Sequence, residues 1–254
     1  MSVEPATSGN ERPAGGAAET RIAREVARPR AGWWLLGLFV TQGVASLIAG
    51  LAVGVDSDKK AAFTTPALGV AGLAGYVVLL AGTIAFAAHS GSSSAVLGLR
   101  RPRPGDLALV PVVLVVVVIA AALINSVLHG GEAQGLDVER HPQDTVQWLW
   151  LVLAVAVLTL AAPVCEELFF RGAVLSSLAA GWFGRRRRAS VSLIASTATI
   201  FGAAHLIPAA FPALAAVGAG LAFLRLRSGS VIPGMLLHVI FNSIAVAAAL
   251  SAGG

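Results

Sequence analysis

Long apolar segments dominate this sequence and restrict the folds that it can adopt. A helix needs about 20 mostly apolar residues to cross the roughly 30 Å hydrocarbon core of a bilayer. The chain of 254 residues is 56% hydrophobic and only 12% charged, whereas a soluble domain is about one quarter charged. We therefore predict an all-α, polytopic transmembrane helical bundle of about seven spans. The expected spans are residues 32–55, 67–88, 107–128, 146–183, 190–207, 210–226 and 231–250.

Most arginines lie before the first apolar segment or between later ones, in residues 1–31, 100–103, 185–188 and 225–227. The positive-inside rule places such clusters in the cytoplasm, which gives a cytoplasmic N-terminus and an outer C-terminus. Residues 1–31 have few large apolar side chains, so we expect a disordered basic cytoplasmic tail before one membrane domain at 32–254. Few aromatic residues accompany the arginines, so the net charge of +5 does not indicate a nucleic-acid partner. The abundance of Ala, Gly, Val and Arg resembles a GC-rich bacterial proteome, and the expected location is the bacterial plasma membrane.

The fourth segment, residues 146–183, is too long for one upright span. As a helix it would measure roughly 55 Å, against about 30 Å for the hydrocarbon core. Splitting it into two spans would place the arginines at 185–188 outside the cell, against the positive-inside rule. We therefore expect one long fourth helix, tilted or bent, with Pro163 as the point of the kink.

Two acids and an arginine interrupt this apolar segment: Glu166, Glu167 and Arg171. Each ionised group at bilayer depth costs about 2.5 to 3.5 kcal/mol, so the three need partners. Glu167 and Arg171 are four residues apart on one helical face, with the acid N-terminal to the base, and are expected to form a structural ion pair. Glu166 lies about 100° around the helix from Glu167 and is left free for chemistry.

Two further polar pairs lie on later apolar segments. Phe201 and His205 are four residues apart and share a helical face, as do His238 and Asn242. Antiparallel packing of the fourth and fifth segments would bring His205 to a depth similar to that of Glu166. A histidine or asparagine in a membrane can also serve only as an interhelical hydrogen-bonding residue. Cys165, the single cysteine, is expected to be a small core residue.

These three motifs together resemble a known family. Glu166-Glu167-x-x-x-Arg171, Phe201-x-x-x-His205 and His238-x-x-x-Asn242 occur in the order typical of the CAAX-protease and bacteriocin-processing (CPBP, or Abi) intramembrane endopeptidases, which include the type II CAAX prenyl endopeptidases. The resemblance covers a motif core at 146–242. A Leu-Gly-Leu-Arg-Arg-Pro stretch at 97–102 also resembles members of this group.

The resemblance implies hydrolysis of a peptide bond within the membrane. By this likeness Glu166 is the general base, and His205 activates or orients the water. Glu167 with Arg171 shapes the site, and His238 and Asn242 stabilise the oxyanion or complete the water site. The expected partners are the lipid bilayer and a peptide or small membrane-protein substrate.

Two questions stay open at the level of sequence. The first is the metal: we favour no required cofactor, but Glu166, His205 and His238 could be three Zn²⁺ ligands, although no His-Glu-x-x-His arrangement occurs. The second is the class of protein, because buried Glu, Arg and His also occur in proton-coupled transporters and could persist in a non-catalytic immunity-type scaffold. No internal repeat supports a transporter, and no motif residue is missing, as one would be from a scaffold that had lost catalysis.

Overall fold

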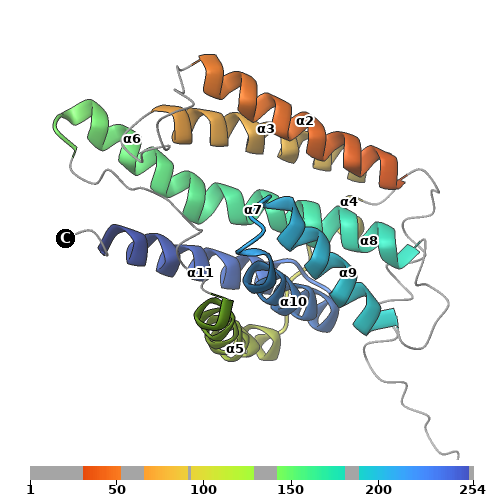
Figure 1. Cartoon of the computed structure of the whole chain (residues 1–254). Helices are drawn as coiled ribbons and strands as arrows, with labels where there is room; N and C mark the ends of the chain where they lie inside the picture. Colours follow the sequence, from red (N-terminus) through yellow and green to blue (C-terminus); the bar gives the residue numbers. More distant parts are fainter. Residues whose placement is uncertain (1–30, 53–65, 91–92, 129–141, 181–188, 252–254) are drawn as a thin grey trace, which may run out of the picture.

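All regular secondary structure in the described part of the protein is helical. The computed structural model describes residues 31–52, 66–90, 93–128, 142–180 and 189–251, and no strand occurs among them. This confirms the predicted all-α fold. The predicted tail and the arginines at 185–188 lie outside the described residues, apart from Ala31. The elements are α2 (Ala31–Ala52), α3 (Pro66–His89), α4 (Ser93–Leu97), α5 (Pro104–Leu128), α6 (Thr145–Ala156), η2 (Val157–Ala161), α7 (Ala162–Glu166), η3 (Glu167–Val174), α8 (Leu175–Leu178), α9 (Ala189–Ala204), α10 (Phe211–Ser228) and α11 (Ile232–Ser251) (Figure 1).

Five of the described helices are long and apolar enough to cross a membrane: Gly69–His89, Pro104–Leu128, Thr145–Leu178, Phe211–Ser228 and Ile232–Ser251. Two shorter apolar helices, Leu35–Ala45 and Ser190–Ala204, coincide with the first and fifth predicted spans. Each of the seven predicted segments therefore contains a helix among the described residues, although residues 205–207 at the end of the fifth segment are not helical. The number of spans and the side on which each terminus lies stay predictions.

The fourth segment is one continuous helix, as predicted. Residues Thr145–Leu178 form a single helical rod of 34 residues, which corresponds to roughly 50 Å. Asp144 caps its start by accepting a hydrogen bond from the Gln147 N–H at 2.8 Å. The rod changes from α- to π-helical geometry twice, at Val157–Ala161 and Glu167–Val174. The first π-helical stretch ends at Ala161, two residues before Pro163, so the change of helical register lies close to the proline.

The other helices pack around this rod on two sides. In Figure 1, α2 and α3 lie along one side of the rod, and α11, α10 and α9 lie along the other. Helix α5 packs against α10 and α11. In Figure 1, α5 is seen almost end-on, whereas α11 runs across the view. The largest buried cluster surrounds Phe169 and Phe170 on the rod and includes Phe201 of α9. The centre of the rod is thus enclosed by helices from both halves of the chain.

The turns after α4 and α10 meet at one end of the bundle. The Val231 N–H donates to the Gly98 carbonyl at 3.1 Å, and the Ser230 hydroxyl donates to the Arg100 carbonyl at 2.7 Å. The two turns, both predicted to be cytoplasmic, are therefore in contact with each other. Arg227 is half exposed and lies 3.9 Å from the carboxylate of Asp106.

Arg225, which was predicted to mark a cytoplasmic turn, lies in the last turn of α10 but does not face solvent. Its side chain is buried, with 1% of its surface exposed, and its Nε donates to the Arg171 carbonyl at 3.1 Å. The short helix α4 was also not predicted. Its end explains the Leu-Gly-Leu stretch, because Gly98 has a positive φ of 68° and a Cβ there would come within 2.6 Å of the Arg225 guanidinium.

Substituting Gly98→Ala should destabilise the bundle. The left-handed backbone alone costs about 1–2 kcal/mol for a residue with a side chain, and the contact with Arg225 adds to this. Thermal unfolding in detergent micelles should show a lower Tm. Gly105→Ala is the matched control, because a Cβ at Gly105 meets nothing within 4 Å. Equal Tm values for the two variants would contradict this account of Gly98.

Candidate active site

Glu167 and Arg171 form the predicted ion pair in the centre of the rod. Arg171 Nη1 lies 3.0 Å from Glu167 Oε1, and both side chains are 0% exposed. Arg171 Nη2 also donates to the Gly218 carbonyl on α10 at 3.1 Å. The guanidinium carbon lies 4.3 Å from the centre of the Phe201 ring, within the range of a cation–π contact. Two other helices, α10 and α9, therefore hold the guanidinium in place.

Glu167 also contacts His238 on α11. The His238 Nδ1 lies 3.2 Å from Glu167 Oε1, and the histidine is 3% exposed. The close approach depends on Gly234, one turn earlier on α11, where a Cβ would come 2.6 Å from Glu167 Oε2. Because a carboxylate accepts, this contact places a proton on Nδ1 and makes Nε2 of a neutral His238 an acceptor.

Glu166 has a different environment from its neighbour. It is 9% exposed, and its Oε1 accepts a hydrogen bond from the hydroxyl of Tyr76 on α3 at 2.7 Å. Its Oε2 is buried with no hydrogen-bond partner among the described residues, and it lies 3.9 Å from His238 Nε2. The structure thus brings Glu166 and His238 together, as the motifs suggested. Cys165 beside it is buried in the core, as predicted.

Sequence reasoning missed Tyr76. The residue is the single tyrosine of the chain and lies within an apolar segment. Its hydroxyl needs a partner in such surroundings, which is the signal that could have identified it. The glutamate that was predicted to be free of a partner within its own helix therefore has one on another helix.

His205 is connected to the other site residues by the ring of Phe201, which it contacts. It lies directly after the end of α9 and is partly exposed. Its Nδ1 donates to the Phe201 carbonyl at 2.8 Å, because a carbonyl can only accept, and this leaves Nε2 without that proton. The Phe201 ring lies 4.8 Å from the His205 ring and 5.6 Å from the His238 ring, centre to centre. Phe201 therefore separates the two histidines and contacts both.

Asn242 contacts the backbone of the rod. Its Nδ2 donates to the Leu158 carbonyl at 2.9 Å. In the π register of η2, the Ala162 N–H bonds the Val157 carbonyl, so the next carbonyl, that of Leu158, faces Pro163. Proline has no N–H. The side chain of Asn242 supplies the donor that Pro163 lacks, and this fixes α11 against the rod one helical turn from His238.

Removing this amide should cost stability, and removing the proline should compensate. Asn242→Ala leaves the Leu158 carbonyl without its donor, at a cost of about 1–3 kcal/mol. Pro163→Ala provides a backbone N–H in its place, so the double variant should recover part of the loss. The measurement is Tm in detergent, analysed as a double-mutant cycle.

Ser243→Ala is the control for this cycle, since the Ser243 hydroxyl bonds only the Val239 carbonyl of its own helix among the described residues. Its Tm should stay close to that of the wild type. The account is wrong if Pro163→Ala gains no more stability in the Asn242→Ala background than in the wild type.

The three candidate zinc ligands of the sequence, Glu166, His205 and His238, are not clustered around one point. Among the described residues, no three His, Cys, Asp or Glu side chains converge in a way that would hold a metal ion. Each histidine directs its Nδ1 to another acceptor: His238 to Glu167, and His205 to the Phe201 carbonyl. As arranged, Glu166, His205 and His238 do not form a three-ligand set.

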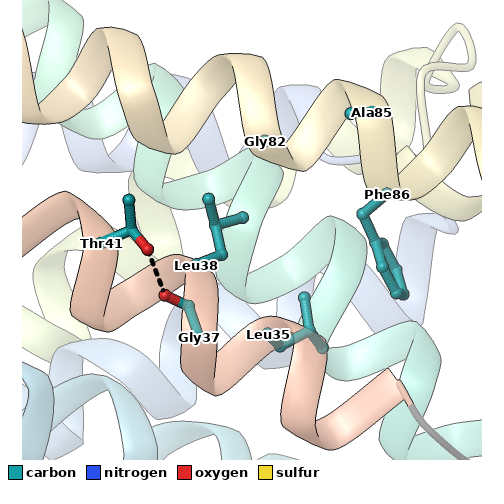
Figure 2. Close-up of a pocket in the computed structure, with 7 residues that line it drawn as sticks. All are labelled: Leu35, Gly37, Leu38, Thr41, Gly82, Ala85 and Phe86. Carbon is teal, nitrogen blue, oxygen red and sulfur yellow. Dashed lines mark hydrogen bonds between the residues drawn. The ribbon is translucent and has the colours of Figure 1, made fainter.

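A groove between α2 and α3 lies outside this constellation. Figure 2 shows its lining of apolar and small residues, in which the Thr41 hydroxyl donates to the Gly37 carbonyl at 2.8 Å. None of the lining side chains drawn there is titratable, so the groove does not carry acid–base chemistry. The residues that line it are Leu35, Gly37, Leu38, Thr41, Gly82, Ala85 and Phe86.

The fold and the site define the class of protein: a helical membrane protein with an acid–histidine site enclosed within its bundle. Residues 148–244 match the model of the family described as type II CAAX prenyl endopeptidase, Rce1-like. This match confirms the resemblance to the type II CAAX prenyl endopeptidases. All residues of the three motifs lie within the match, whereas Tyr76 lies outside it. The family is one of proteases, which indicates a membrane protease with a peptide substrate. No curated protein and no solved structure matches the chain.

Proposed function

We propose that the protein is an intramembrane endopeptidase that hydrolyses a peptide bond of a membrane-associated peptide or protein with a water activated by Glu166. The observation that carries this proposal is the buried Oε2 of Glu166, which has no hydrogen-bond partner among the described residues and lies 3.9 Å from His238 Nε2. A buried carboxylate without a cation of its own is a candidate for function.

The distance between these two atoms suits a bridging water. With Nδ1 of His238 protonated and bound to Glu167, Nε2 of the neutral ring and Oε2 of Glu166 are both acceptors. A water between them donates one hydrogen to each, at about 2.8 Å, and keeps its lone pairs for the substrate. Its oxygen attacks the scissile carbonyl carbon while Glu166 takes the proton. Glu166 then returns this proton to the leaving amine as the C–N bond breaks.

The remaining residues have supporting roles in this proposal. Glu167 and Arg171 hold His238 in the required tautomer. Asn242 is one turn from His238 and has a second amide hydrogen beyond the one used by Leu158, which we assign to the oxyanion. His205 is partly exposed and lies on the other side of Phe201 from His238, where it orients the peptide. An apolar enclosure strengthens both the base and the oxyanion contacts.

Glu166→Gln should abolish cleavage while the protein stays folded. Loss of the general base reduces the rate by about 10²- to 10⁴-fold. The measurement is cleavage of a membrane-peptide library by purified protein in liposomes. The Tm of the variant is measured alongside and should equal that of the wild type, which shows that the variant is folded. Cys165→Ala is the control, because it changes the adjacent buried residue and should leave cleavage within a few-fold.

A zinc chelator added to both proteins tests the metal alternative. Cleavage that is lost on chelation and restored by zinc would contradict the direct role of Glu166 as base. A wild type that cleaves nothing, while partner binding or ion flux depends on Glu166, would instead favour the scaffold or transporter reading.

A further inference from the structure

We propose that Tyr76 is a positioning residue for the general base. Its phenol donates a hydrogen bond to Oε1 of Glu166, so that Oε2 is the oxygen that accepts the proton of the water. The inference rests on the proposed function and adds to it a residue from the first half of the chain. The phenol oxygen lies 2.7 Å from Oε1, a normal length for an O–H···O hydrogen bond.

The two carboxylate oxygens of Glu166 are not equivalent in this structure. Oε1 accepts from Tyr76, whereas Oε2 is buried and has no hydrogen-bond partner among the described residues. Tyr76 of α3 contacts Oε1, and His238 of α11 lies 3.9 Å from Oε2. Cys165 and Arg171 of the rod also interact electrostatically with Glu166. Nε2 of a neutral His238 is an acceptor, so the phenol is the donor of this set that fixes the carboxylate.

Fixing one oxygen matters because a glutamate side chain has three rotatable torsions. The 3.9 Å separation of Oε2 and His238 Nε2 suits a shared water only while the carboxylate keeps its present orientation. Helix α3 packs against both α7 and η3, so the phenol is held on a neighbouring element and does not move with Glu166. Tyr76 thus acts through Glu166 and needs no contact with the substrate.

Tyr76→Phe is the first test, because it removes the hydroxyl and keeps the ring. A misplaced base lowers the rate by about ten- to a hundredfold. We expect this loss in kcat, with KM changed by less than about twofold, since substrate binding does not involve the phenol. Thr83→Val is the matched control: it removes another buried hydroxyl from α3, one that bonds the Leu79 carbonyl of its own helix at 2.6 Å. It should leave kcat unchanged.

The single tyrosine makes a second test possible that does not depend on activity. Protein grown with tyrosine labelled at the phenol carbon gives one ¹³C resonance, that of Tyr76. Glu166→Gln replaces the charged acceptor and should shift this resonance, whereas Thr83→Val should not. An unchanged resonance in Glu166→Gln would mean that the phenol does not bind Glu166, and the inference would be wrong.

The two tests separate this inference from the proposed function. If wild type cleaves peptide and Tyr76→Phe keeps the full kcat, the inference is overturned while the protease remains. If kcat and KM change equally in Tyr76→Phe and Thr83→Val, the effect is a general one on α3, which also overturns it. If wild type cleaves nothing, the proposed function fails and the positioning role fails with it, even where the resonance still reports the contact.

Discussion

Glu167 and Arg171 form an ion pair that compensates both charges in the interior of the protein, where both side chains are 0% exposed. Removing one partner of such a pair leaves an uncompensated buried charge and costs about 3–5 kcal/mol. The pair also connects elements, because Arg171 contacts the Gly218 carbonyl and the Phe201 ring while Glu167 contacts His238. The rod, α9, α10 and α11 therefore meet at one charged centre, and the tautomer of His238 follows from it.

Two adjacent glutamates differ in role because of where a helix directs them. Successive residues point about 100° apart, so Glu167 faces the arginine and α11, whereas Glu166 reaches Tyr76 on α3. The first carboxylate is fully buried, and its Oε1 contacts both Arg171 and His238. The second has no cation within its own helix and accepts its hydrogen bond from a phenol. In both glutamates Oε2 has no hydrogen-bond partner among the described residues. The same side chain thus serves structure at one position and, in our proposal, chemistry at the next.

The helical rod contributes through its irregularities. Its π-helical stretches lie on either side of α7, the short segment that ends at Glu166. The first stretch directs the Leu158 carbonyl toward a proline that cannot bond it, and the Asn242 amide fills that position. A residue that the motif assigns to the site therefore also has a structural contact. Its effect on activity and its effect on stability have to be measured separately.

The sequence by itself determined the helical class, the long fourth helix and the pairing of Glu167 with Arg171, because these depend on apolar length and on spacing within one helix. It did not determine the contacts of Tyr76 with Glu166 or of His238 with Glu167, which join distant segments. Those contacts depend on how each helix is rotated and how helices cross. Arg225 and Arg227 illustrate this: two residues apart, they point about 200° apart on α10. One arginine must face inward and the other outward, and only the packing of α10 decided that Arg225 is the buried one.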